Sequence, residues 1–310
     1  MIEVKGLTKF YKHIRAIEDV SFTVERGDIV GFLGPNGAGK TTTMKIITGF
    51  MPPDSGTAKV AGFDVFEQPM EVKKRIGYLP ENPPLYNDMT VNDYLKFVAS
   101  IKGVESKKIN DEIERVSEKC AIKDVSKRLI AHLSKGYRQR VGIAQAILGN
   151  PEIVIFDEPT IGLDPNQVFE VRTLIKELAR EKTVILSTHI LPEVEMTCKK
   201  VIVIHKGHIV ATEPIEDLLR RRKRINEVVI RVRRFSLELM KQIQEKFNVK
   251  INQPPQMEDG FNVIFENDED KREEIAKFIV DGGFGLLELR PITLSLEDVF
   301  RELTTEEKAA

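Results

Sequence analysis

The chain has 310 residues, of which 41% are hydrophobic and 31% charged, and its net charge is −1. This composition is typical of a soluble globular protein, and the lack of a strong charge bias argues against a nucleic-acid partner. The length favours one large domain followed by a smaller one.

The apolar runs of the sequence are short. Representative runs are Ile153–Phe156 and Val201–Ile204, far below the roughly 18 to 20 residues that a membrane-spanning helix needs. The first residues, Met1–Lys5, are charged and strand-like and do not resemble a secretory signal. We therefore expect a cytoplasmic protein that does not itself cross a bilayer. The two cysteines, Cys120 and Cys198, are predicted to pack in the core.

Two predicted strands, Val20–Val24 and Ile29–Leu33, begin an α/β core. The second leads directly into a match to the phosphate-binding pattern G-x-x-x-x-G-K-[ST], which a predicted helix follows from Thr42. The glycines let successive backbone N–H groups point at one anion, and the helix N-terminus favours negative charge. We expect the loop and Thr42 to bind a nucleotide, with Lys40 on the β- and γ-phosphates and the Thr41 hydroxyl on Mg²⁺. The matching segment is Gly34-Pro35-Asn36-Gly37-Ala38-Gly39-Lys40-Thr41.

A helical insertion is predicted at about residues 85 to 150. Helical spacing of apolar residues marks Asn92–Ile101 and Ile109–Cys120. The sequence Thr90–Asp93 resembles a capping box that begins the first of these helices.

The next buried strand, Ile153–Phe156, ends in two acids. Asp157 is placed to hold Mg²⁺ through water, as the second acid of a phosphate-loop site does. Glu158 can polarise the attacking water, although a structural role in capping the turn at Pro159-Thr160 is an alternative. A GTPase would carry an N-K-x-D segment, and the chain has no Asn-Lys pair.

Two further strands are predicted, at Thr183–Ser187 and Val201–Ile204. His205 and His208 follow the second strand and flank Lys206-Gly207. No further ligands accompany them, so a hairpin explains this pair better than a metal site does.

A basic run at Arg220–Arg224 marks the predicted boundary between domains 1–220 and 225–310. A solvated linker is the favoured interpretation of this run, and contact with anionic lipid is the alternative. Residues 225–310 contain 12 Lys and Arg against 18 Asp and Glu, a net charge of −6 that again disfavours nucleic acid.

The second domain is predicted to have the order βαββαβ, which indicates a small ferredoxin-like α+β module. Its elements are expected at Val228–Val232, Leu237–Phe247, near Val249, Phe261–Phe265, Glu273–Val280 and Leu286–Leu289.

A specific resemblance begins 24 residues before Asp157, at the sequence Leu133-Ser134-Lys135-Gly136-Tyr137-Arg138-Gln139-Arg140. Here the chain resembles the ABC ATPase family, whose signature reads L-S-G-G-Q, and the resemblance covers residues 1 to about 220. It implies a phosphate-loop NTPase core with a helical subdomain. In that family the signature begins a helix whose N-terminus binds the γ-phosphate of ATP held by the other subunit.

The resemblance also implies roles for single residues. Tyr11 matches the aromatic residue that stacks on adenine, and Ser134 and Gly136 match signature positions. Glu158 matches the catalytic carboxylate, and His189 matches the switch histidine that contacts the γ-phosphate.

Three positions depart from the family pattern. Glu81 stands where the family has a glutamine that touches Mg²⁺ and water; a carboxylate can ligate Mg²⁺ but adds negative charge beside the phosphates. Lys135 replaces a signature glycine, and Tyr137 replaces the signature glutamine. Lys135 adds positive charge near the phosphate, whereas Tyr137 lacks the amide that would contact ribose.

The family resemblance implies a dimer, either with a second copy or with a paralogous ABC subunit, and Asp164 matches the acid that bridges the two subunits. It also implies a separate membrane permease, which the helical insertion and the segment Tyr78–Leu85 would contact on the cytoplasmic face of the cell membrane. The tail Pro291–Phe300 resembles the extension of an exporter subgroup that pairs with ABC-2-type permeases.

Two other functional classes stay open at this point. One is a soluble ABC-family ATPase of translation or DNA repair, although the chain has one phosphate loop and no long heptad run. The other is a regulatory module that holds ATP without hydrolysing it, against which Lys40, Asp157, Glu158 and His189 argue.

Overall fold

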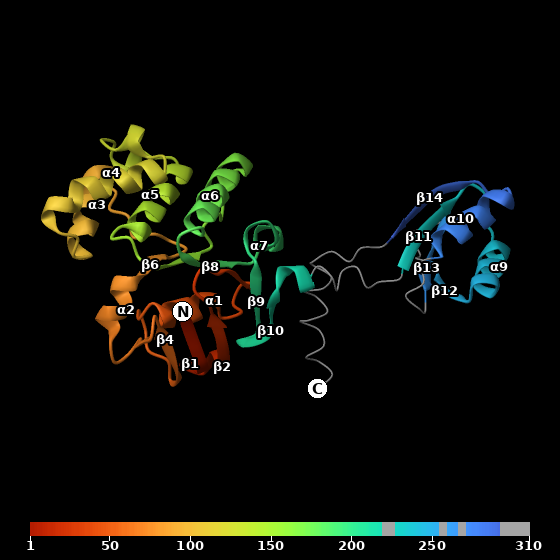
Figure 1. Cartoon of the computed structure of the whole chain (residues 1–310), viewed down its shortest axis with the longest axis horizontal. Coiled ribbons are helices and arrows are strands. Elements are labelled where there is room, and N and C mark those ends of the chain that lie inside the picture. Colours follow the sequence, from red (N-terminus) through yellow and green to blue (C-terminus); the bar gives the residue numbers. More distant parts are fainter. Residues whose placement is uncertain (219–226, 254–258, 266–270, 292–310) are drawn as a thin grey trace. The chain divides into compact units, whose positions relative to one another are not determined.

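The computed structural model describes residues 1–218, 227–253, 259–265 and 271–291. The chain forms two compact units, Met1–Ile215 and Glu216–Ala310 (Figure 1). The predicted linker Arg220–Arg224 and the tail segment after Pro291 lie outside the described residues. Within the described ranges, no helix combines the length and apolar character needed to cross a bilayer.

The first unit begins with an antiparallel sheet of strand order β2-β1-β4-β5. Burial alternates along β1 and β2, because one face of the sheet packs on the core and the other meets solvent. The predicted strand Val20–Val24 is the end of a longer strand. The bounds are β1 Ile2–Tyr11, β2 Ile14–Val24, β4 Ser55–Val60 and β5 Phe63–Asp64.

A six-stranded sheet of order β10-β9-β3-β8-β7-β6 forms the centre of this unit. Its strands are parallel except β10, which pairs antiparallel with β9. Every residue of β3, β7 and β8 is buried, which explains their unbroken apolar sequences. The bounds are β3 Ile29–Leu33, β6 Ile76–Leu79, β7 Ile153–Asp157, β8 Thr183–Thr188, β9 Lys200–His205 and β10 His208–Pro214.

The register of the parallel strands brings their carboxyl ends to one edge. Leu33 of β3 pairs with Thr188 of β8, and Asp157 of β7 pairs with Ser187 of β8. The loops that follow β3, β7 and β8 therefore begin side by side, which is where ligand sites of open α/β sheets lie.

The helices α3, α4 and α5 group together on the far side of the unit from the antiparallel sheet (Figure 1). The predicted cap at Thr90 is present, since its hydroxyl accepts a hydrogen bond from Asp93 N at 3.1 Å. The predicted helix Ile109–Cys120 ends one residue earlier, with Cys120 as its C-cap. The bounds are α1 Lys40–Ile47, α2 Pro69–Arg75, α3 Val91–Ile101, α4 Ile109–Lys119, α5 Lys135–Ile147, α6 Pro165–Leu178 and α7 Leu191–Thr197.

The second unit contains an antiparallel sheet of order β12-β13-β11-β14. Alternate residues of its strands, such as Ile230 and Phe261, form one core with Leu239 and Ile243 of α9 and Ile275 of α10. Both helices therefore cover the same face, which is the arrangement of a ferredoxin-like module. The bounds are β11 Glu227–Val232, α9 Leu237–Phe247, β12 Val249–Asn252, β13 Gly260–Phe265, α10 Arg272–Asp281 and β14 Leu286–Pro291.

Candidate active site

The loop between β3 and α1 curls around a buried ammonium group. Lys40 is 6% exposed, and its Nζ donates to the carbonyl oxygens of Gly34 at 2.8 Å and Pro35 at 3.2 Å. Gly39 has a φ of 109°, and a Cβ at this position would lie 2.8 Å from the Ala16 carbonyl oxygen. Gly39 is thus required both by backbone conformation and by close packing.

A cavity of about 270 Å³ lies over this loop and the first turn of α1. It combines backbone N–H groups and the Thr41 and Thr42 hydroxyls with two carboxylates, Glu81 and Glu158. Tyr11 is not among the lining residues in the described part of the chain; its hydroxyl instead contacts the Met51 sulfur at 3.2 Å. The lining comprises Ala16, Asn36, Gly37, Gly39, Lys40, Thr41, Thr42, Glu81, Glu158 and Ile161.

The carboxylate of Glu158 joins two groups that come from distant parts of the sequence. Its Oε1 lies 3.3 Å from Lys40 Nζ, and its two oxygens lie 3.0 and 2.9 Å from His189 Nδ1. The side chain is 6% exposed, so water screens these contacts little. The loops after β3, β7 and β8 therefore meet at one carboxylate.

The backbone of Glu158 is left-handed, with a φ of 50°. A residue with a Cβ pays of order 1–3 kcal/mol for this conformation, which the surrounding structure must maintain. The Glu158 N–H donates to the Ser187 carbonyl at 2.8 Å, and the Ile161 N–H donates to the Glu158 carbonyl at 3.3 Å. These bonds hold the turn that directs the carboxylate toward Lys40 and His189.

Asp157 ends β7 fully buried and directly precedes Glu158, which lines the cavity. Its Oδ1 accepts from the Ser187 hydroxyl at 2.7 Å, whereas its Oδ2 has no hydrogen-bond partner among the described residues. Burial raises the pKa of Asp157, and the hydroxyls of Ser187 and Thr41 oppose that rise. Ser187 was not a candidate at the level of sequence, because a strand serine carries no distinctive signal.

The donor set near Asp157 fits Mg²⁺. Carboxylate and hydroxyl oxygens suit this hard cation, which takes few protein ligands and completes its shell with water and phosphate oxygens. The free Asp157 Oδ2 and the Thr41 hydroxyl offer such a partial shell.

The predicted signature residues lie at the N-terminus of α5 and against the start of α6. Ser134 is the N-cap of α5 and accepts from Tyr137 N at 3.3 Å. A Cβ on Gly136 would lie 2.6 Å from the end of the Gln167 side chain, so the first turn of α5 lies close to the first turn of α6. Asp164 is the N-cap of α6 and accepts from Gln167 N at 3.0 Å. The signature and Asp164 are thus neighbours.

Lys135 and Tyr137, which depart from the family signature, make local contacts. A Cβ on Gly162 would meet Lys135 Nζ, which places this ammonium beside the turn before Asp164. The Tyr137 hydroxyl donates to Asp124 at 2.7 Å, and this hydrogen bond raises the pKa of Tyr137. Neither residue lines the cavity over the phosphate loop as far as the structure describes it.

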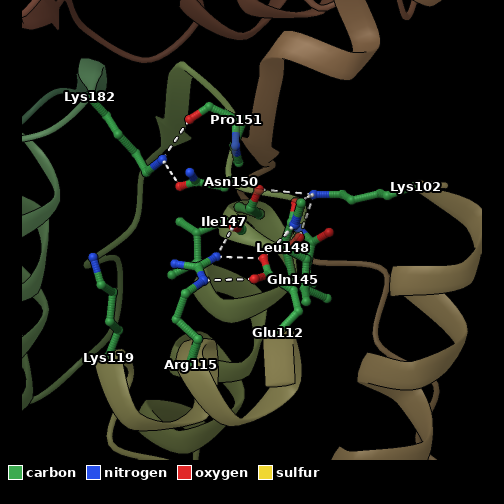
Figure 2. Close-up of polar contacts among 12 residues, drawn as sticks. Lys102, Glu112, Arg115, Lys119, Gln145, Ile147, Leu148, Asn150, Pro151 and Lys182 are labelled. Carbon is green, nitrogen blue, oxygen red and sulfur yellow. Dashed lines mark hydrogen bonds and ion pairs between the residues drawn. The ribbon is translucent and has the colours of Figure 1, made fainter. Parts of the chain in front are cut away.

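Cations from two other helices hold the far end of α5 (Figure 2). Lys102, which follows α3, donates to the carbonyl oxygens of Gln145 at 2.6 Å, Ala146 at 2.9 Å and Leu148 at 3.3 Å. Arg115 of α4 donates to the Ile147 carbonyl at 3.0 Å. These hydrogen bonds satisfy the last carbonyl groups of α5, as Ser134 satisfies a backbone N–H at its N-terminus, so α5 is capped at both ends.

The histidine pair and the two cysteines singled out from the sequence have structural explanations. His205 and His208 pair across the β9–β10 hairpin, as predicted, and His208 Nε2 lies 3.2 Å from Glu18. Cys120 and Cys198 are both buried and free, which confirms the predicted core packing, and burial raises the pKa of Cys120 to about 12.

Comparison with known proteins gives consistent matches. The model of the ABC transporter family matches residues 17–161. The bacitracin transport ATP-binding protein BcrA of Bacillus licheniformis is 34% identical over 98% of this chain and 97% of its own length. The ABC transporter ATP-binding protein NatA of Bacillus subtilis is 41% identical over 67% of this chain and 85% of its own. A solved ATP-binding subunit of an ABC transporter superposes with a TM-score of 0.65 at 32% identity, covering 71% of this chain and 92% of that one.

Proposed function

Because the chain belongs to the family of ABC transporter ATP-binding proteins, we propose that it hydrolyses ATP in a Mg²⁺-dependent reaction and drives a separate membrane permease. The observation that carries this proposal is the position of Glu158. Its carboxylate lies between the ammonium of the phosphate loop and the ring nitrogen of His189, 3.3 and 2.9 Å away.

Each part of the site has a chemical task in this proposal. Lys40 and the loop N–H groups bind the β- and γ-phosphates and stabilise charge that develops in phosphoryl transfer. Glu158 orients the attacking water and accepts its proton, while His189 fixes the carboxylate and contacts the γ-phosphate. When bound, Mg²⁺ neutralises phosphate charge, and the oxygens of Thr41, Asp157 and Glu81 would hold it. Tyr11 would stack on adenine.

The signature residues act on a second copy or a paralogous subunit in this proposal. Ser134, Lys135, Gly136 and Tyr137 would present the N-terminus of α5 to the ATP held by the partner, with Asp164 at the contact between subunits. Two copies related by a two-fold axis would complete two sites. The dimer would close when ATP binds and open after hydrolysis. The work available to the permease would be limited by the difference in binding free energy between ATP and its hydrolysis products.

The permease is proposed to be of the ABC-2 type, with export as the direction of transport. The support is the match to the bacitracin transport protein over nearly the full length of both chains. The protein would then lie on the cytoplasmic face of the cell membrane, with no role in nucleic-acid binding.

The variant Glu158→Gln tests the catalytic assignment. It keeps the shape of the side chain but removes the base, so ATP turnover should fall by about 100-fold or more while ATP binding is kept or strengthened. Phosphate release and nucleotide binding are measured on the same preparation. Unchanged turnover would refute the role given to Glu158.

A further inference from the structure

A buried carboxylate on α7 has no part in the site described so far. Glu193 is 3% exposed, and both of its oxygens accept hydrogen bonds from buried threonine hydroxyls. Its Oε1 accepts from Thr160 Oγ1, and its Oε2 accepts from Thr188 Oγ1 at 2.9 Å. Within the described ranges no cation forms an ion pair with it. Burying a carboxylate without a cation beside it destabilises a fold, so Glu193 is a candidate for a functional role.

The two threonines belong to the two segments that carry the proposed catalytic pair. Thr160 lies two residues after Glu158, in the turn that follows β7. Thr188 ends β8 and directly precedes His189, and its hydroxyl also accepts from Ile190 N at 3.1 Å. One carboxylate therefore connects the turn of Glu158 to the strand end of His189.

The helix that carries Glu193 rests firmly on the central sheet. A Cβ on Gly31 of β3 would lie 2.5 Å from Val194, the residue next to Glu193, so α7 approaches the strand as closely as a glycine permits. The Glu193 N–H also donates to the Ile190 carbonyl at 3.1 Å. The carboxylate is thus a fixed point relative to β3, which leads into the phosphate loop.

We propose that Glu193 is a positioning residue that sets the geometry of the Glu158–His189 pair; this inference rests on the proposed ATPase function. By binding Thr160 and Thr188 together, Glu193 holds the strained turn of Glu158 at a constant distance from His189. The preorganised pair then needs no rearrangement when the reacting water is bound. Glu193 itself touches neither the nucleotide-binding loop nor the cavity in the described part of the chain.

The test compares Glu193→Ala with Glu193→Gln in full-length protein. The alanine variant should lower kcat by about tenfold or more, the size of effect seen when hydrogen-bond partners of metal ligands are removed, with KM for ATP changed less than about twofold. The glutamine variant should recover part of that loss, because an amide can donate to one threonine oxygen and accept from the other. Thr197→Val, a buried change on the same helix outside this network, should leave kcat unchanged.

A double-mutant cycle decides whether Glu193 acts through the pair. In a His189→Ala background, Glu193→Ala should change kcat by less than about twofold, because the geometry it maintains no longer exists. If Glu193→Ala does not fold, Thr160→Val and Thr188→Val remove its partners singly and should each lower kcat. An unchanged kcat in folded variants, or an equal loss in the His189→Ala background, would overturn the inference.

The wild type and Glu158→Gln are measured alongside these variants. If the wild type turns over ATP, Glu158→Gln does not, and Glu193→Ala matches the wild type, the positioning role is wrong while the proposed function stands. If Glu158→Gln matches the wild type, the proposed function itself is wrong.

Discussion

Replacing Lys102 by methionine should remove a pH-dependent contribution to stability. The ammonium is buried at the C-terminus of α5, and burial lowers its pKa from 10.5 to about 8, with a nearby carboxylate, Glu112, opposing the shift. Below pH 8 the group is charged in both the folded and the unfolded chain. Between pH 8 and 10.5 the unfolded chain retains a proton that the folded chain has released.

The sign of the effect follows from proton binding. Stability rises with pH wherever the unfolded state binds more protons, so Lys102 makes the free energy of unfolding increase through this window. The difference of about 2.5 pKa units corresponds to roughly 3 kcal/mol at 1.36 kcal/mol per unit. At neutral pH the charged Lys102 therefore makes the free energy of unfolding about 3 kcal/mol smaller than its neutral form would. Its three hydrogen bonds nevertheless fix the end of α5.

The assay is urea unfolding of the first unit, followed by circular dichroism at several values between pH 7 and 10. Other groups titrate in the same range, so the informative quantity is the free energy of the wild type minus that of Lys102→Met. This difference should rise with pH by an amount on the order of 3 kcal/mol. Lys96→Met, an exposed change on α3, should give a difference that does not vary with pH. A flat or falling difference for Lys102→Met would refute the reasoning.

Two other substitutions probe the phosphate loop and the metal side of the cavity. Gly39→Ala should destabilise the protein by about 2–4 kcal/mol and abolish nucleotide binding, because it combines a left-handed backbone with a Cβ 2.5 Å from Ile17. Gly37→Ala, with a φ of 79° but open space around its Cβ, should cost only about 1–2 kcal/mol when both variants are compared by urea unfolding. Equal losses would contradict the packing argument. Glu81→Gln should raise the Mg²⁺ concentration needed for half-maximal ATPase activity, whereas Glu118→Gln on the exposed face of α4 should not. An unchanged Mg²⁺ requirement in Glu81→Gln would exclude Glu81 as a metal ligand.

The sequence was sufficient to predict the elements with strong periodicity or a complete local motif. The buried strand Ile29–Leu33 and the helix Leu237–Phe247 have the predicted bounds. The strands β4 and β5 were not predicted, because β4 is mostly exposed and polar and β5 has two residues. β4 pairs with β1 and β5 pairs with β4, and such pairing depends on contacts across the sheet, which a local pattern does not contain.

The candidate site likewise contains residues that a local motif predicts and residues that only tertiary contacts reveal. The phosphate loop is one continuous motif and Asp157 and Glu158 are adjacent residues at the end of a strand, so local patterns identified both segments. Glu193 contacts Thr160 across 33 residues, and Lys102 contacts Gln145 across 43 residues. A lone glutamate or lysine on a helix is ordinarily a solvated side chain, and only tertiary packing buries these two.

The left-handed backbone at Glu158 has a consequence for the evolution of such a protein. Glycine at this position would relieve the strain and remove the carboxylate at once. Under the catalytic role proposed for Glu158, one substitution would therefore give a chain that folds better and does not hydrolyse ATP. Selection for folding alone would favour that substitution. The glutamate therefore persists only under selection for turnover, and a lineage released from that selection should lose it early.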